Sequence, residues 1–354
     1  MDIFVSKLGD NRDGRSWKTA YHSIQQALLA VPDARGGHRI IVRPDTYVEA
    51  NLYPAYKGAV GAYNELIGDS YNQWGSGATG WVVIDSGDPA AGFKSYDWWS
   101  TFRAYLKGWS PGHTDEGFSC IIWDRWRFEG LYTTGSDAGL FFDGVQQHEP
   151  FSILVENCVG IGRAFGGGVA GVLSRPEEPI RFRHCHLWAL DFIGDTAAAY
   201  LRVENKTMPA QPDTILEHCT LVGPQCSVKT SNFTLTPYTW ISLKSCHLIT
   251  LNFSQPEMGQ PSAGIIVSVQ RGECLKIDLE DCLLMGYKVF GVMVEEDTVK
   301  DIQYATHGDC RAYVQFKQDV PPGFRRLTAW PTTEFQTLAP LDRPAGRPAV
   351  GPGV

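Results

Sequence analysis

A short motif, in which an apolar residue precedes two polar residues and a cysteine, occurs five times between residues 155 and 282 of this chain. The cysteines of successive copies are 27, 34, 27 and 36 residues apart. Such a recurring interval is typical of a solenoid, in which each repeat buries its apolar side chains only by stacking on the next repeat. If each repeat is one coil, the five cysteines form a ladder inside the solenoid. The copies are Val155–Cys158, Phe182–Cys185, Leu216–Cys219, Leu243–Cys246 and Leu279–Cys282.

The rest of the chain favours short strands over helices. Apolar runs of a few residues alternate with Gly, Asn and Asp, and helical periodicity is almost absent. One helix is expected near the N-terminus, where Ser23 opens a capping box and residues 24–31 carry an apolar stripe. A strand at 39–42 follows it. Two glycine-rich stretches, 160–162 and 166–171, lack the Lys-Ser/Thr of a phosphate loop, so we expect them to form turns of a coil.

The first fifty residues resemble the N-terminal cap of pectin-lyase-like right-handed parallel β-helix proteins. The segments that carry this resemblance are Ile3–Ser6, Gly9-Asp10, Gly14, Ser16-Trp17, Ser23–Leu28 and Ile40–Glu49. The cysteine motif is similar to the coil strands of the same superfamily, so the resemblance extends over residues 1–315. It implies an all-β, right-handed parallel β-helix with a short N-terminal capping helix and long aromatic-rich loops. Polysaccharide lyases, glycoside hydrolases, esterases, phage tailspikes and adhesins share this fold, so the resemblance leaves the function open.

Four regions are expected along the chain. Residues 1–50 form the cap strand, the helix and the first coil, and residues 51–117 form aromatic-rich loops and early coils. Residues 118–315 form the regular coils. Residues 316–354 form an extended tail, because their linker-like composition cannot bury a core.

Composition excludes several classes of partner. The 354 residues include 31 Lys+Arg and 39 Asp+Glu, and the net charge of −8 argues against binding to nucleic acid or to an acidic membrane surface. No apolar run reaches the roughly 20 residues that cross a bilayer, so no membrane insertion is expected. Nine cysteines cannot all pair within one chain, and most lie in apolar runs, which favours free thiols and folding in a cytoplasm. The N-terminus shows no signal-peptide pattern.

Aromatic residues between positions 51 and 117 are the first candidate site. Trp74, Trp98, Trp99 and Trp109 could stack on sugar rings, form a subunit interface, or pack internally against the solenoid. The sequence leaves these three readings open.

Catalytic and metal-binding residues are harder to find. Asp191 and Asp195, with Glu204 nearby, are the only carboxylates we single out as an acid and base for hydrolysis, and the superfamily's hydrolase and lyase motifs are absent. Histidines neighbour several motif cysteines, but alternation along a strand sends the two residue types to opposite faces. We therefore expect no metal site and no cofactor.

Two functions remain. The first is a non-enzymatic structural or binding β-helix of a larger assembly, such as a phage tail, spike or decoration protein, with homo-oligomeric subunits and possible glycan contact. Such a protein would fold in the cytoplasm and end in a virion or other particle. The alternative is a secreted polysaccharide lyase or glycoside hydrolase whose signal peptide has been removed.

Overall fold

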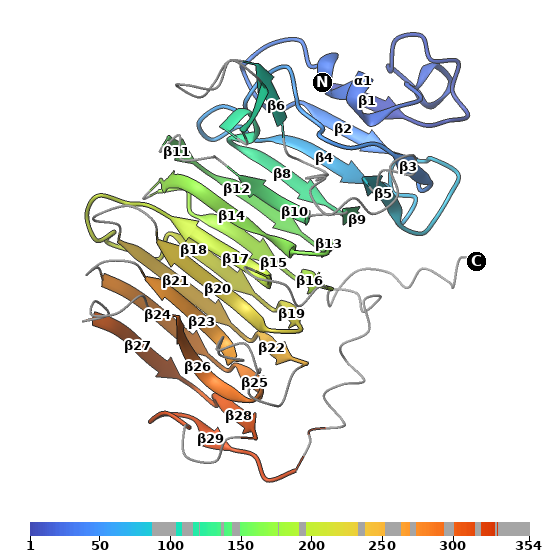
Figure 1. Cartoon of the computed structure of the whole chain (residues 1–354). Helices are drawn as coiled ribbons and strands as arrows, with labels where there is room; N and C mark the ends of the chain where they lie inside the picture. The colour runs from blue at the N-terminus through green and yellow to red at the C-terminus, as the bar shows by residue number, and fades with distance from the viewer. Residues whose placement is uncertain are drawn as a thin grey trace.

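The computed structural model of this chain describes most of the solenoid. The described residues are 1–86, 104–107, 116–119, 121–135, 138–143, 149–175, 177–190, 196–232, 238–251, 263–269, 274–293, 301–315, 320–329 and 331. They form three parallel sheets, here called A, B and C, whose strands stack from the N-terminal end to the C-terminal end (Figure 1). The predicted all-β, right-handed parallel β-helix is confirmed.

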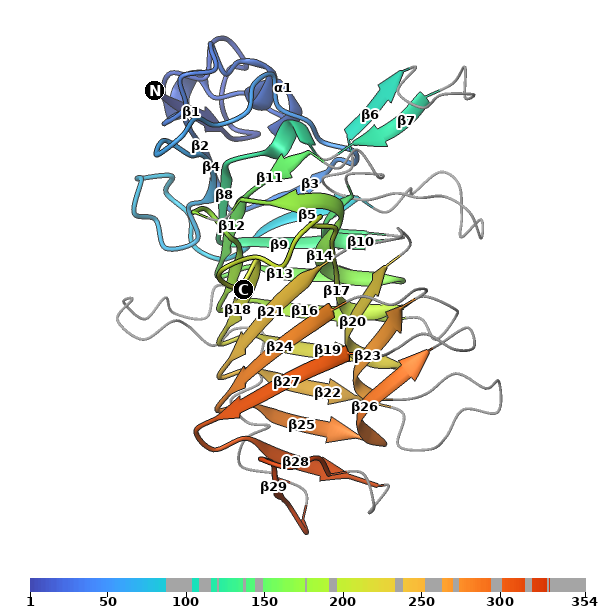
Figure 2. The same ribbon diagram turned by 90° about the vertical axis from the view of Figure 1, so that its left-hand side faces the viewer.

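Between residues 126 and 293, each coil contributes one strand to each sheet, in the order A, B, C along the chain (Figure 2). The strands of sheet A are β1 (Asp2–Val5), β2 (Arg39–Val42), β4 (Asn64–Gly68), β8 (Trp126–Glu129), β12 (Ile153–Glu156), β15 (Ile180–Arg183), β18 (Thr214–Glu217), β21 (Thr239–Lys244), β24 (Cys274–Glu280) and β27 (Asp301–His307). The strands of sheet B are β3 (Thr46–Val48), β5 (Val82–Ser86), β9 (Leu131–Gly135), β13 (Val159–Gly162), β16 (His186–Ala189), β19 (Thr220–Gly223), β22 (His247–Thr250), β25 (Leu283–Gly286), β28 (Arg311–Val314) and β29 (Arg325–Arg326). The strands of sheet C are β10 (Ala138–Asp143), β14 (Phe165–Ser174), β17 (Ala197–Val203), β20 (Cys226–Asn232), β23 (Ala263–Val269) and β26 (Lys288–Met293), with β11 (Pro150–Phe151) beside the end of β14.

The N-terminal end of the solenoid is closed by the 3-10 helix η1 (Trp17–Thr19) and by helix α1 (Ile24–Leu29) (Figure 1). The Ser23 side chain accepts a hydrogen bond from the Gln26 backbone N–H, as the capping motif predicted. A second cap comes from a distant residue: the Glu49 carboxylate accepts hydrogen bonds from the N–H groups of Ile24 and Gln25 at 2.7 and 2.9 Å. The apolar face of α1 covers the end of the core, where Leu28 is fully buried.

A two-residue turn joins sheet A to sheet B in the central coils, and the repeated motif encodes it. The residue before each motif cysteine has a left-handed backbone conformation, with φ between 49° and 53°. Asn, Asp and His tolerate this conformation better than most residues. These turn residues are Asn157, His184, His218, Ser245 and Asp281.

The motif cysteines follow these turns and point into the core. All five are at most 1% exposed, and they occupy equivalent positions of successive coils. From Cys185 onward, each thiol donates to the carbonyl oxygen of the motif's apolar residue in the preceding coil; Cys246, for example, lies 3.3 Å from Leu216 O. A small side chain with a weak donor therefore adds a contact to a strand carbonyl of the preceding coil.

The glycine-rich stretches differ from the sequence prediction. Residues 160–162 lie in strand β13, and residues 166–171 lie in strand β14, so the prediction that they form turns is wrong. The reason is close packing between sheets B and C. A Cβ atom at Gly166 would overlap the backbone of Leu187 and Trp188 in the next coil. Glycine here makes room for a neighbouring strand.

Outside the three sheets, the antiparallel hairpin of β6 (Ala104–Lys107) and β7 (Glu116–Ser119) projects from the side of the solenoid (Figure 2). The 3-10 helix η2 (Ile121–Trp123) follows it and leads into β8. No helix among the described residues has the length and apolar character needed to cross a membrane.

Candidate functional site

The outer face of sheet C carries a row of aromatic side chains. Register places Phe141 of β10, Gly168 of β14 and Tyr200 of β17 side by side on neighbouring strands. Because Gly168 has no side chain, the row has a gap at β14. The Phe165 ring occupies this region and stacks on both neighbours, with ring centroids 4.8 Å from Phe141 and 4.9 Å from Tyr200.

Charged groups continue this row toward the C-terminal end of the solenoid. Lys229 of β20 is in register with Tyr200, and Arg202 lies two residues farther along β17. The Arg202 guanidinium is ion-paired with the Glu204 carboxylate. Since alternate residues of a strand face the same side, Tyr200, Arg202 and Lys229 share the outer face. The face therefore combines stacked rings, two cations and one carboxylate.

These side chains are almost completely buried. Phe141, Phe165 and Tyr200 are 2%, 8% and 6% exposed, and Lys229 is 1% exposed. Charges at such depth need partners, because an uncompensated buried charge costs several kcal/mol. Flat rings beside cations suit a ligand with apolar ring faces and carboxylate groups. We name these residues, with Arg202 and Glu204, the sheet C site.

Most residues singled out in the sequence fall elsewhere. Trp98, Trp99 and Trp109 lie outside the described residues, as do Asp191 and Asp195. Trp74 is half-buried beside sheet A, where the Arg39 guanidinium lies 4.6 Å from its ring centroid.

The contacts of Trp74 separate it from the sheet C site. One face of the Trp74 ring is occupied by Arg39, and its carbonyl oxygen accepts a hydrogen bond from the Trp17 indole at 2.8 Å. Trp74 thus belongs to the packing of the N-terminal cap. Glu204, by contrast, follows β17 and belongs to the sheet C site through its ion pair with Arg202.

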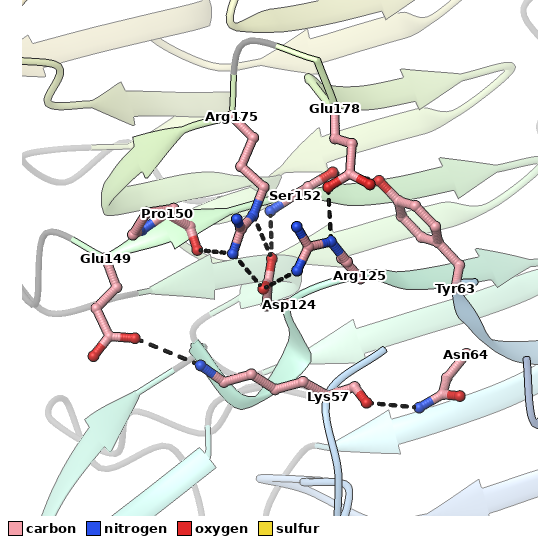
Figure 3. A network of polar contacts seen from close by, with 10 residues as sticks. All are labelled: Lys57, Tyr63, Asn64, Asp124, Arg125, Glu149, Pro150, Ser152, Arg175 and Glu178. Atoms are coloured by element: carbon pink, nitrogen blue, oxygen red, sulfur yellow. Dashed lines mark hydrogen bonds and ion pairs between the residues drawn. The ribbon is translucent and has the colours of Figure 1, made fainter. Parts of the chain in front are cut away.

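A second polar network lies where β8, β12 and β15 begin (Figure 3). Asp124 is 2% exposed and accepts hydrogen bonds from the Ser152 N–H at 3.0 Å and from the Arg175 guanidinium at 2.8 Å. Arg125 bonds to Glu178 at 2.7 Å and approaches Asp124 at 3.5 Å. Two carboxylates and two guanidinium groups balance one another, so we assign this network to the joining of successive coils.

The outer face of sheet A is also covered by paired charges. Arg127 reaches Glu129 and Glu156 at 2.8 Å and Glu65 at 3.5 Å. Arg183 continues the series to Glu156 and Glu217. Opposite charges on neighbouring strands stabilise the sheet modestly. We therefore take the control residue for experiments on the sheet C site from this face.

The described residues contain no group of three or more His, Cys, Asp or Glu side chains arranged to hold a metal ion. Of the histidines beside the motif cysteines, His184 and His218 lie in the turns, whereas His186 and His247 begin strands β16 and β22. His184 and His218 stack face to face, with ring centroids 4.9 Å apart and planes 7° from parallel. Parallel rings cannot both direct a nitrogen lone pair at one ion.

The motif thiols are expected to be inert in the folded protein. Burial raises the pKa of Cys158 to about 12, and burial likewise raises the pKa values of Cys219 and Cys246. Because the thiolate is the nucleophile, these groups should resist alkylation. Iodoacetamide at about pH 8, followed by peptide mass spectrometry, is expected to label none of the three in native protein and all of them in urea. Labelling of Cys219 at the rate of a free peptide thiol would contradict this.

Comparisons with known proteins agree with the fold. No family model matches the chain, and no curated protein matches it. The crystal structure of pectate lyase Pel9A superposes with a TM-score of 0.54 over 92% of this chain and 73% of that chain, at 11% identity. The pectin methylesterase from Aspergillus niger gives a TM-score of 0.46 at 12% identity, over 92% of this chain and 90% of its own. With its three parallel sheets, this chain has the pectin-lyase-like right-handed parallel β-helix fold.

Proposed function

We propose that this protein binds an acidic polysaccharide along the outer face of sheet C. The observation that carries the proposal is the stacked row of Phe141, Phe165 and Tyr200, continued in register by Lys229. Apolar faces of sugar rings pack on aromatic rings, and cations pair with uronate carboxylates. Because the side chains are 1 to 8% exposed, the proposal requires the face to open when the polysaccharide binds.

Replacing Lys229 with Met tests this proposal. Met keeps the length and the apolar stem of the side chain and removes the charge, so the fold should survive. We expect the variant to bind polygalacturonate about tenfold more weakly, which corresponds to about 1.4 kcal/mol. Isothermal titration calorimetry measures the affinity. The ultraviolet absorbance of an unsaturated product, followed in the same samples, shows whether the protein also cleaves the chain by elimination.

Lys244→Met is the matched control. Lys244 lies on sheet A, where its ammonium group pairs with Glu280 at 3.7 Å, and it is 45% exposed. Its replacement should leave the affinity for polygalacturonate unchanged. Equal weakening by the two variants would show that net charge governs binding and that the sheet C site does not.

A second candidate function is that of a subunit in a larger assembly, such as a phage tail or spike. Exposed apolar side chains at the N-terminal end favour it: Leu8, Val48 and Val60 are 75%, 60% and 78% exposed. We infer self-association of copies through this end. Light scattering on the untagged protein is expected to give a mass at least twice the 39.2 kDa of one chain. A monomer at all concentrations would refute self-association.

A further inference from the structure

One arginine on the outer face of sheet A lacks the carboxylate partner that its neighbours have. Arg181 lies in β15, and register places Leu154 of β12 and Ile215 of β18 directly beside it. The adjoining residues of β15, Ile180 and Phe182, belong to the main core, so Arg181 points outward. The three side chains in register are half-buried. We call Leu154, Arg181 and Ile215 the Arg181 site.

Two carboxylates of the same face flank Arg183, which is the next outward residue of β15. Glu156 bonds to Arg183 at 3.4 Å, and Glu217 bonds to it at 2.9 Å. Glu156 also bonds to Arg127 at 2.8 Å. Neither carboxylate bonds to Arg181, and no other described residue offers Arg181 a carboxylate or a hydrogen-bond acceptor. The positive charge of Arg181 therefore has no counterpart on this face.

Part of the Arg181 guanidinium group is shielded from water. Its Nε atom is inaccessible to solvent and has no hydrogen-bond partner in the described part of the chain. The two outer nitrogens are not buried in this way, so a ligand can reach them. Water screens a charge less well in such surroundings, and an anion at the outer nitrogens therefore gains more energy than at a fully hydrated arginine.

We propose that Arg181 binds the carboxylate group of a small acid whose body is apolar. The planar guanidinium group matches a carboxylate with parallel hydrogen bonds. Leu154 and Ile215 offer aliphatic surface on both sides of this contact, which suits a hydrocarbon chain better than a strongly hydrated sugar or phosphate. The Arg181 site and the sheet C site lie on different sheets, so this inference does not depend on the proposed binding of polysaccharide.

Hexanoate tests the proposal with the full-length protein. Titration is followed by two-dimensional NMR of protein labelled with 15N in arginine, where the signal missing from Arg181→Met identifies the Arg181 Nε–H. We expect hexanoate to shift this signal and to bind the wild-type protein in the millimolar range. Acetate keeps the carboxylate but lacks the hydrocarbon chain, so it should bind several-fold more weakly. Equal affinities for the two acids would overturn the proposal.

Arg181→Met keeps an apolar side chain of similar length and removes the charge, so the fold should survive. It should bind hexanoate about tenfold more weakly, measured by the shifts of the remaining arginine signals or by calorimetry. Arg12→Met is the matched control, because Arg12 is 65% exposed and lies in the N-terminal cap. The control should leave the affinity for hexanoate unchanged. Equal weakening by the two variants would show that net charge governs binding and would refute the site.

Ile215→Thr tests the apolar part of the Arg181 site separately. Threonine keeps the branched Cβ that suits a strand and removes aliphatic surface beside the guanidinium group. The variant should weaken hexanoate several-fold and leave acetate unchanged, and an equal change for both acids would contradict the proposal.

Polygalacturonate separates this inference from the proposed function. Arg181→Met should bind polygalacturonate as tightly as the wild-type protein does. A loss of that affinity would place sheet A in the polysaccharide surface and would overturn the assignment to an apolar acid. If neither protein binds polygalacturonate while Arg181→Met still weakens hexanoate, the proposed function fails and the Arg181 site stands.

Discussion

Replacing Asp213 with Asn is expected to raise the free energy of unfolding by about 4 kcal/mol above about pH 7, and to change it little near pH 4. Asp213 lies fully inside the solenoid, between β17 and β18, and is 2% exposed. Burial raises the pKa of its carboxyl group from 3.8 to about 7. The acid is therefore protonated in the folded chain under conditions that ionise it in the unfolded chain.

The direction of the pH dependence follows from proton binding. Between about pH 4 and pH 7 the folded state holds one more proton than the unfolded state at this residue, so stability falls as pH rises. At about 1.4 kcal/mol per pH unit the loss reaches about 4 kcal/mol. Asn carries no charge at any pH and keeps an oxygen for the Trp240 N–H, which lies 2.8 Å from Asp213 Oδ2.

Urea unfolding of both proteins from about pH 4 to pH 8 measures this difference. Asp10→Asn is the matched control, because it makes the same replacement at a side chain that is 44% exposed. The difference between wild type and the control should stay constant across the series. A constant difference for Asp213→Asn as well would show that the carboxyl group ionises alike in the folded and unfolded states.

Replacing Gly168 with Ala is expected to destabilise the protein by about 3 to 5 kcal/mol. Gly168 has a φ of 129°, a backbone conformation that side chains disfavour. A Cβ atom there would also overlap the carbonyl oxygen of Tyr200 on the adjacent strand. Backbone cannot move aside as a side chain can, so strands β14 and β17 must separate. The Phe165 stack, and with it polysaccharide binding at the sheet C site, should be lost.

Gly264→Ala distinguishes this effect from the general cost of an added methyl group. Gly264 lies in β23 of the same sheet, and its Cβ would come 3.1 Å from the end of the Leu284 side chain, which can rotate away. We expect this control to change the stability by about 1 kcal/mol or less. Thermal unfolding and near-ultraviolet circular dichroism report on stability and aromatic packing. Equal losses in the two variants would refute the special role of Gly168.

The repetitive parts of the fold were predictable from local pattern. Ser23 predicted the start of α1, the apolar run at 39–42 predicted β2, and the spacing of the cysteine motif predicted the coils. Each of these signals depends on residues close together in the chain. The Glu49 cap of α1 was not predicted, because its partners lie 24 and 25 residues away.

The sheet C site could not be found in the same way. Phe141, Gly168, Tyr200 and Lys229 come from four strands, and only the register of those strands aligns them. Nothing in the sequence distinguishes them from other apolar or basic residues in strand-like runs. The glycine-rich stretch that frames Phe165 was assigned to turns because glycine usually marks them. The packing of neighbouring coils requires it inside a strand instead.

Local sequence pattern was sufficient to predict the architecture of this protein, a capped parallel solenoid. It could do so because a solenoid buries each repeat against the next, so the same local requirements recur along the chain and become visible as a period. The contacts between side chains on the outer faces could be read from the folded chain alone. Those contacts depend on the register between coils. Because the loops differ in length, the number of residues between two partners varies along the chain, although the partners still lie side by side in the structure.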